Sequence, residues 1–195
     1  MAVYEFIQGS VASLSPTAAI IEQGGIGYCI QISLHSYSQI REMKSVQLLI
    51  HEIIREDTHD LYGFFTSSER ELFRQLISVS GVGANTSRMM LSSLSPEEIS
   101  QAIMRDDVIL LKTIKGIGAK TAQRIIIDLR DKLGQMEESL QFLHGSDNTA
   151  RDEALSALTM LGFGKSITGK VLDKLLSGKG DWEVEELIKA ALKKL

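Results

Sequence analysis

The sequence carries one pattern twice, as Ile77–Leu91 (ISVSGVGANTSRMML) and as Leu111–Ile127 (LKTIKGIGAKTAQRIII). Aligning Gly81-Val82-Gly83 with Gly116-Ile117-Gly118 sets an offset of 35 residues between the copies. Each copy has an apolar stretch, a Gly-apolar-Gly turn, three variable residues, a small residue and a second apolar face. This pattern predicts a helix–hairpin–helix unit, and its recurrence at a fixed offset predicts two of them.

The chemistry of the unit favours phosphate as a ligand. Glycine lets the backbone turn sharply and approach a ligand closely, because it has no Cβ. The second helix of each unit should begin just after the second glycine, where its first amides lack partners and carry the positive end of the helix dipole. An anion bound there needs no side-chain reader, so binding should be indifferent to base sequence.

In the second copy, Lys120, Thr121 and Arg124 add two charges and a hydroxyl, so it should be the stronger electrostatic contact. The alternative for a single such turn is that it only links two packed helices, and the second copy argues against that. Val82 and Ile117 should point into the core. The predicted DNA-binding residues are Gly81, Val82, Gly83, Asn85, Thr86, Arg88, Gly116, Ile117, Gly118, Lys120, Thr121 and Arg124.

The net charge of −4 is unevenly distributed along the chain. Residues 1–64 hold 3 Lys/Arg and 7 Asp/Glu, which gives −4, whereas residues 65–138 hold 10 of each and residues 139–195 hold 8 of each. A DNA-binding surface must therefore be a local face of the middle segment rather than a property of the whole chain.

Targeting and metal signals are absent from the sequence. Cys29 is the only cysteine, which excludes an intrachain disulfide and a cysteine-rich metal site. The N-terminus lacks the features of a signal peptide, and no apolar run approaches the roughly 20 residues of a spanning helix. The four histidines show no metal-ligand spacing. We expect a cytoplasmic protein.

Residues 1–64 have the pattern of β-structure. Five short runs in this length suit a small closed barrel such as an OB-fold. With only three cations, the segment is a poor candidate for a general single-strand binder. The turn Arg55–Thr58 should form the tip of a strand pair, and its plainest interpretation is a solvated turn. The predicted strands are Val3–Gly9, Ala18–Glu22, Tyr28–Ile32, Val46–Ile54 and His59–Phe64.

Residues 65–138 have the pattern of helices. Ser67–Leu76 begins with cap residues, and Ser95-Pro96-Glu97-Glu98 has serine at the cap, proline at the first helical position and glutamate at the third. That helix should run to about Met104, with Asp106 or Asp107 capping the next. Residues 139–148 are polar and weakly periodic, which predicts a linker.

Residues 149–195 show three apolar stripes at helical spacing, typical of a three-helix bundle suited to docking a partner. Within them, Gly164–Lys170 (GKSITGK) nearly matches a nucleotide-binding loop. The next residue is Val171 instead of the Ser or Thr that would hold magnesium, and no strand precedes it. We therefore reject a nucleotide site.

Four segments in this order resemble the RuvA family, bacterial proteins that bind Holliday junctions beside the RuvB motor. The resemblance spans essentially the whole chain. The segments are Arg55–Phe64 (REDTHDLYGF), Ser80–Leu91 (SGVGANTSRMML), Lys115–Lys132 (KGIGAKTAQRIIIDLRDK) and Ala154–Phe163 (ALSALTMLGF).

The resemblance implies an α+β protein of three domains: an OB-fold barrel (1–64), a tandem helix–hairpin–helix domain (65–138) and a C-terminal three-helix domain similar to ubiquitin-associated bundles (149–195). It implies a homotetramer, or an octamer on DNA, that binds four-way junctions. Glu56 and Asp57 match the family's acidic pin at the crossover. The implied partners are a RuvB-type hexameric ATPase and a RuvC-type resolvase. ATP and magnesium would be used by the motor, with no cofactor in this chain. The expected partner-binding residues are Leu161, Gly162, Phe163, Leu187 and Ile188.

Three positions depart from the family pattern. Ala84 and Asn85 stand where proline and lysine are common, and Ala119 replaces a frequent lysine. Backbone amides survive these changes, so we expect weaker, more salt-sensitive binding in the same mode. Two other functions remain open: a helix–hairpin–helix nuclease or glycosylase, and a protein-interaction adaptor acting through its tail. The acids available to an enzyme are Glu56, Asp57, Asp60 and Asp128.

Overall fold

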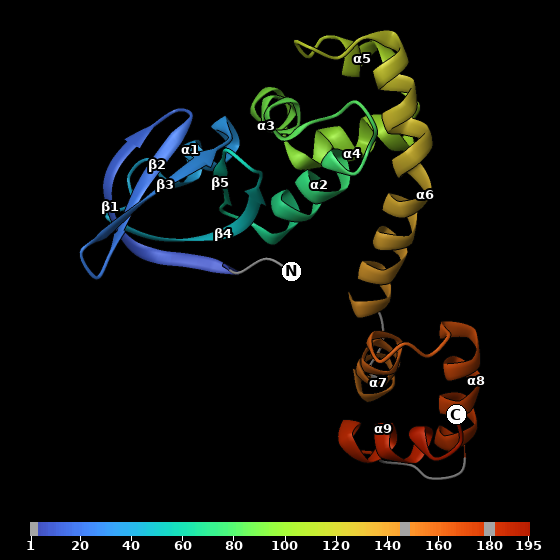
Figure 1. Cartoon of the computed structure of the whole chain (residues 1–195). Coiled ribbons are helices and arrows are strands. Elements are labelled where there is room, and N and C mark those ends of the chain that lie inside the picture. Colours follow the sequence, from blue (N-terminus) through green and yellow to red (C-terminus); the bar gives the residue numbers. More distant parts are fainter. Residues whose placement is uncertain (1–3, 145–148, 178–181) are drawn as a thin grey trace. The chain divides into compact units, whose positions relative to one another are not determined.

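The computed structural model describes residues 4–144, 149–177 and 182–195 (Figure 1). Its contacts divide the chain into two compact units, Met1–Gly134 and Gln135–Leu195. The first unit contains a β-barrel and a group of helices, and the second contains the C-terminal helices. Each unit is described below by itself.

Five strands close into a barrel in the order β1-β2-β3-β5-β4, with β3 and β5 parallel and the other pairs antiparallel. The barrel is lined by aliphatic side chains that alternate along the strands, among them Ile7, Ile21, Ile30, Leu48 and Ile50. The five-stranded barrel expected from the sequence is confirmed, although β1 runs further than predicted. The strands are β1 (Phe6–Ser15), β2 (Ala18–Gln23), β3 (Ile26–Ile32), β4 (Ser45–Ile54) and β5 (His59–Phe64).

A short helix, α1 (Leu34–Ile40), connects β3 to β4 and was not predicted from the sequence. Ser33 caps it, because its hydroxyl accepts from the amide of Ser36. The helix has only seven residues, and Ser36 and Ile40 are its buried positions. Such a segment gives too little periodicity to be recognised in a sequence.

The helical part of the first unit contains two helix–turn–helix pairs, α2 with α3 and α5 with α6, separated by α4. Ser95 and Glu98 form a complete capping box at the start of α4, with Pro96 as its first residue, and Asp107 caps α5. These starts agree with the sequence prediction. The helices are α2 (Ser67–Ile77), α3 (Ala84–Ser93), α4 (Pro96–Met104), α5 (Val108–Lys112) and α6 (Ala119–His144).

Helix α6 differs from the sequence prediction, because residues 139–144 belong to it instead of to a linker. Gly134 lowers helix propensity without stopping the helix, since a single glycine costs only about 1 kcal/mol relative to alanine. The boundary between the two compact units falls at this glycine. The rest of the predicted linker, residues 145–148, lies outside the described residues.

The barrel and the helices of the first unit share an aromatic contact. The ring of Phe73 on α2 lies 5.2 Å from Tyr62 and 4.8 Å from Phe64, both on β5, and 5.5 Å from His51 on β4. Phe73 is fully buried. The end of β5 therefore enters the same core as the helices and fixes one side of the barrel against α2.

A buried carboxylate strengthens this interface between the barrel and the helices. Glu69 on α2 is fully buried and accepts hydrogen bonds from the hydroxyls of Ser33 and Ser36 at the start of α1. Burial raises the pKa of Glu69, although the two hydroxyl donors act in the opposite direction. At the edge of the interface between the barrel and the helices, Arg70 forms an ion pair with Glu5 at 2.6 Å. These contacts hold the barrel and helices in one orientation.

The second unit is a bundle of α7 (Thr149–Met160), α8 (Lys165–Leu176) and α9 (Val184–Leu192). Gly164 caps α8, and the segment before it is helical, which agrees with the rejection of a nucleotide loop. No helix in the described part of the chain has the length and apolar character needed to cross a membrane. The bundle core consists of Ala154, Leu158, Leu172, Leu175, Leu187 and Ala191.

Burial of Glu69 between the barrel and the helices leads to a prediction about stability. Glu69→Ala leaves the hydroxyls of Ser33 and Ser36 without their acceptor, so we expect a loss of about 2–4 kcal/mol in the free energy of unfolding, measured by urea denaturation. Glu71→Ala, on the same helix but partly exposed, is the matched control and should change stability by less than about 0.5 kcal/mol. Equal effects of the two substitutions would contradict a stabilising role for the buried hydrogen bonds of Glu69.

Candidate nucleic-acid interface

The two predicted hairpins have the same backbone geometry. Each turn connects two helices through hydrogen bonds that recur at the 35-residue offset found in the sequence. The matched pairs are Val79 N–Leu76 O (3.1 Å) with Ile114 N–Leu111 O (3.3 Å), Val82 N–Val79 O (3.0 Å) with Ile117 N–Ile114 O (3.1 Å), and Ser87 N–Gly83 O with Ala122 N–Gly118 O (both 2.9 Å).

The first glycine of each turn has a left-handed backbone, with φ of 90° at Gly81 and 93° at Gly116. Side chains are strained in this region, so glycine is needed at both positions for conformational reasons. The second glycine differs, since Gly83 has φ of −89°, which any residue adopts. A Cβ at any of these four glycines, Gly118 included, would meet nothing within 4 Å. The corners are therefore open to the outside of the unit.

The apolar residue between the glycines points inward, as predicted. Val82 is 4% exposed and Ile117 is 5% exposed, and both belong to the core of the helical domain. Their amides already donate to Val79 and Ile114 within the turn. Val82 and Ile117 therefore anchor the corners and offer no free N–H to a ligand, so their place among the DNA-binding residues stays a prediction that this geometry does not support.

The free donors are the amides that follow each corner. Helix α3 begins at Ala84 after the cap residue Gly83, and α6 begins at Ala119. The first amides of a helix have no acceptor within it, and they carry the positive end of its dipole. Among the described residues, no hydrogen bond is formed by the amides of Gly83, Ala84, Asn85 or Thr86.

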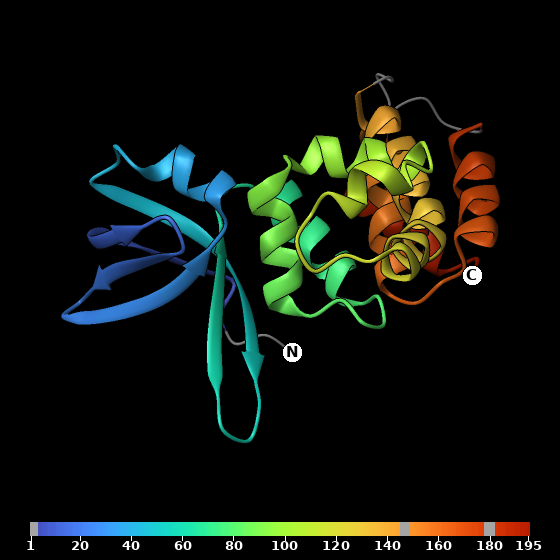
Figure 2. The ribbon, with the colours of Figure 1, turned by 90° about the horizontal axis from the view of Figure 1, so that it is seen from above.

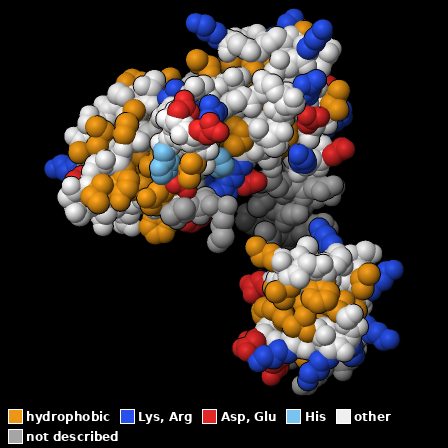
Figure 3. All heavy atoms as spheres, viewed as in Figure 1, with side chains coloured by type: hydrophobic (Ala, Val, Ile, Leu, Met, Phe, Trp, Pro, Cys, Tyr) orange, Lys and Arg blue, Asp and Glu red, His pale blue; other side chains and the backbone are white. Residues whose placement is uncertain are grey.

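Positive charge gathers at the second hairpin. Lys112, Lys115 and Lys120 lie before, within and after its turn, and all three are exposed. Figure 3 shows Lys and Arg side chains at the end of the first unit where α5 and the start of α6 lie in Figure 1. At the first corner, Ala84 is buried and Asn85 is exposed but neutral. The predicted difference in charge between the two hairpins is therefore present at the surface.

Two predicted DNA-binding arginines make contacts within the protein. Arg88 on α3 donates from Nη1 to the carbonyl of Thr17, between β1 and β2, at 2.9 Å. Arg124 on α6 donates from Nη1 to the carbonyl of Ser80, which precedes the first corner, at 3.1 Å. Arg88 thus joins the helices to the barrel, and Arg124 joins the second hairpin to the first. Neither contact could be predicted from the residue pattern alone.

The acidic turn lies at the tip of the β4–β5 hairpin. The amide of Arg55 donates to the carbonyl of Thr58 at 2.8 Å and closes the turn, while Glu56 and Asp57 are exposed. Figure 2 shows this hairpin extending beyond the rest of the barrel. Lower on the hairpin, His59 lies 2.6 Å from Glu52. The two acids are therefore presented to solvent on a projecting element.

The acids considered for a nuclease are not brought together. Asp60 accepts from Gln31 at 3.1 Å on the barrel, whereas Asp128 lies on α6 in the helical domain. Among the described residues, no group of three or more His, Cys, Asp or Glu side chains is placed to hold a metal ion. The geometry therefore gives no support to a metal-dependent nuclease at the hairpin tip.

The predicted partner-binding residues of the second unit divide into surface and core. Leu161 is 62% exposed, and Gly162 continues the turn with φ of 96°. Phe163 and Ile188 are partly buried against the bundle core. Leu187 is fully buried and belongs to the bundle core, so its role as a contact stays a prediction that its burial does not support. Sequence reasoning missed two exposed neighbours, Met160 and Ile167, at 87% and 64%.

The fold and the paired corners define a tandem helix–hairpin–helix protein with an N-terminal barrel. Comparison with known families agrees: residues 73–131 match the SAM-like helix-hairpin-helix tandem, residues 4–63 the RuvA N-terminal domain, and residues 149–195 the RuvA C-terminal domain. The chain belongs to the RuvA family.

Full-length relatives support this assignment. Proteins described as Holliday junction branch migration complex subunit RuvA are 49% identical in Christiangramia forsetii, 48% in Flavobacterium psychrophilum and 46% in Bacteroides thetaiotaomicron. The alignments cover 97–98% of this chain and 98–99% of the relatives. The similarity therefore includes the barrel, the hairpins and the C-terminal bundle together.

The two glycines of one corner should respond differently to alanine. Gly81→Ala places a side chain at φ of 90° and should cost about 1–2 kcal/mol in the free energy of unfolding. Gly83→Ala has ordinary backbone angles and open space. Alanine caps a helix less well than glycine but also restricts the unfolded chain, and because these effects of about 0.5–1 kcal/mol oppose each other, the net loss should be smaller than at Gly81. Urea denaturation of both variants measures the difference. A larger loss at Gly83 would show that the corner is not as described.

Proposed function

We propose that this chain is the DNA-binding RuvA subunit of a Holliday junction branch migration complex. It binds four-way junctions without regard to base sequence, through the open amides of both hairpins. The observation that carries the proposal is the exact recurrence of the hairpin geometry, which gives one domain two anion sites of the same design. Two sites on one subunit suit the phosphates of a single duplex arm.

The chain acts as a non-catalytic component. We infer a homotetramer, because four equivalent arms call for four equivalent sites, with a second tetramer completing an octamer on DNA. ATP and magnesium are used by a RuvB-type hexameric ATPase, and the complex hands the junction to a RuvC-type resolvase in the cytoplasm. Mass measurement with and without junction DNA tests this stoichiometry, and a monomer under both conditions would contradict it.

Glu56 and Asp57 act as an acidic pin. Their exposure at the tip of a projecting hairpin supports this role, since negative charge near phosphates repels them and would keep the duplex arms apart at the crossover. The same repulsion explains why the barrel of a DNA-binding protein carries a net charge of −4.

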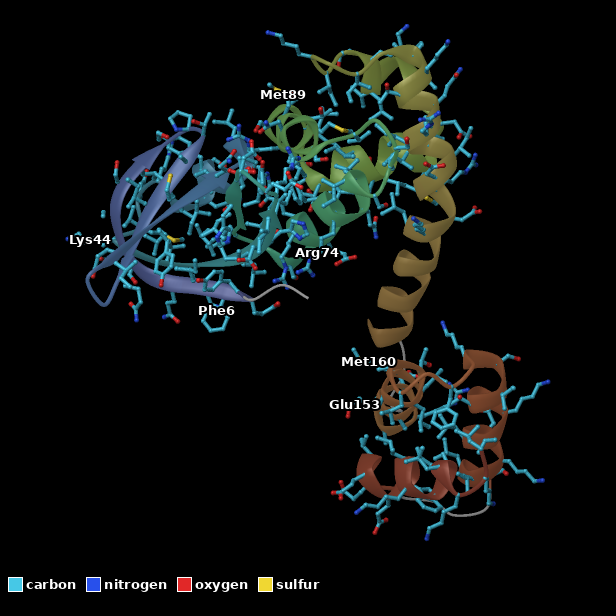
Figure 4. The ribbon with its side chains drawn as sticks, viewed as in Figure 1. Phe6, Lys44, Arg74, Met89, Glu153 and Met160 are labelled. Carbon is cyan, nitrogen blue, oxygen red and sulfur yellow. The ribbon has the colours of Figure 1, made fainter. Side chains whose placement is uncertain are left out.

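The second unit recruits the motor through an apolar patch of Met160, Leu161 and Ile167. Among the large hydrophobic residues described in the bundle, these three have the highest exposed fractions. Figure 3 shows apolar side chains gathered on this unit. Figure 4 places Met160 at the edge of the bundle. An apolar patch rimmed by charge is typical of a protein–protein contact.

The corners are tested by substitution at their second glycines. Gly83→Val and Gly118→Val should each weaken binding to a four-way junction about tenfold or more, because a side chain would block the phosphate that the amides hold. Melting temperatures should fall by no more than a few degrees, because nothing lies within 4 Å of either added Cβ and valine is only a poorer helix cap than glycine. Gel shifts with junctions of two unrelated sequences measure the loss, and retained affinity in both variants would refute the amide mechanism.

The pin is tested by charge reversal. The double substitution Glu56→Lys with Asp57→Lys should tighten junction binding about tenfold and steepen its salt dependence, because it replaces repulsion of phosphate with attraction. Branch migration by the complete complex should slow. The same assay in magnesium examines the enzyme alternative: cleavage of the junction that Glu56→Gln abolishes would support a nuclease in place of the pin.

The patch is tested by Leu161→Asp, which should lower stimulation of the hexameric ATPase about tenfold or more, because a buried apolar contact would be replaced by a charge. Junction binding should be unchanged. Glu153→Ala, exposed on the neighbouring α7, is the control and should have no effect. Loss of stimulation in both variants, or in neither, would remove the patch as the docking site.

A further inference from the structure

One side-chain contact of the second hairpin has no counterpart in the first. Arg124 on α6 donates from Nη1 to the carbonyl of Ser80, the residue before Gly81, at 3.1 Å. At the 35-residue offset, Arg124 corresponds to Met89 on α3 and Ser80 corresponds to Lys115. Met89 is 44% exposed (Figure 4) and has no N–H or O–H to donate from its side chain. The second hairpin therefore reaches to the first, with no equivalent contact in return.

This contact fixes the peptide at the first corner. The described residues contain no cis peptide, so the N–H of Gly81 points opposite to the Ser80 carbonyl that Arg124 holds. Glycine at φ of 90° has wide backbone freedom, and a hydrogen bond on the preceding carbonyl restricts it. Arg124 thereby sets the direction of one amide at the first corner.

The same contact places a cation where the first hairpin lacks one. Its turn is followed by Ala84 and Asn85, and the nearest arginine along α3, Arg88, donates to Thr17 of the barrel. The guanidinium of Arg124 has five donors, and the Ser80 carbonyl is the single acceptor recorded for it among the described residues. Arg124 is exposed, and its Nη1 lies 3.1 Å from the carbonyl that precedes Gly81, so the guanidinium lies beside the first corner.

We propose that Arg124 is the phosphate-contacting cation of the first hairpin, although its sequence position assigns it to the second. The inference rests on the proposed function, because it takes the corners to be phosphate sites. Lys120, in the first turn of α6, serves the second corner, so each hairpin has one cation and the two sites become more alike than the sequence suggests.

A double-mutant cycle on the full chain tests this assignment, with a four-way junction as ligand. Arg124→Ala should weaken binding about tenfold and reduce the slope of log affinity against log salt by about 0.9, the loss of one phosphate contact. Combined with Gly83→Val, its effect should fall short of the product of the single effects by about threefold or more, because both changes remove the same contact. Combined with Gly118→Val, the effects should multiply. Lys120→Ala should show the reverse pattern.

Three further variants separate the explanations. Arg124→Gln keeps a donor for the Ser80 carbonyl without the charge, so it should lose the salt slope as Arg124→Ala does. If Gln restores both slope and affinity, Arg124 only positions the corner and the phosphate contact is wrong. Gln123→Ala, exposed beside it on α6, should bind like the wild type. Arg124→Lys keeps the charge and should retain most of the salt slope. Melting temperatures identify any variant that fails to fold.

The outcomes also distinguish this inference from the function on which it rests. Wild-type protein that binds the junction while Arg124 couples to Gly118, or to neither glycine, overturns the inference and leaves the proposed function standing. Wild-type protein with no preference for a four-way junction over linear duplex overturns both.

Discussion

The proposed function depends on a small set of backbone amides that have no acceptor among the residues that the structure describes. They follow the corners at Gly81–Gly83 and Gly116–Gly118, and they are available because they begin helices α3 and α6, where no preceding turn supplies an acceptor. The unpaired amides of a helix start attract anions whatever the sequence of the nucleic acid. A protein that must hold any junction in a genome gains from this indifference, since phosphates are the part of DNA that does not vary.

The rest of the first unit determines where those amides lie. Glu69 and Phe73, both on α2, join the helices to the barrel, one through buried hydroxyl donors and the other through aromatic contacts. The acidic tip at Glu56 and Asp57 is therefore fixed relative to the corners within a single compact unit. In the proposed function, attraction at the corners and repulsion at the tip would act on the same DNA from set positions, which is the arrangement that an opened junction requires.

Much of this organisation could be predicted from the sequence. The glycine corners, the five strands and the capping box at Ser95 each leave a local signal, because special backbone angles, alternation and caps restrict residue types. Tertiary contacts between distant residues leave no such local signal in the sequence. Glu69 has the pattern of an ordinary first-turn acid, and Arg124 that of a contact in its own hairpin, until the fold brings Ser33, Ser36 and Ser80 to them. The extension of α6 through Gly134 was missed because glycine weakens a helix without ending it.

Amide chemical shifts measure the central claim most directly. In a transverse-relaxation-optimised NMR titration of deuterated, ¹⁵N-labelled protein with a four-way junction, the largest shifts should fall on the amides of Gly83, Ala84 and Asn85 and on those of Ala119 and Lys120. The shifts should be alike for junctions of unrelated sequence, because phosphates carry no base information. If these amides keep their positions while others on the barrel or the C-terminal bundle shift, the corners do not hold the DNA and the account is contradicted.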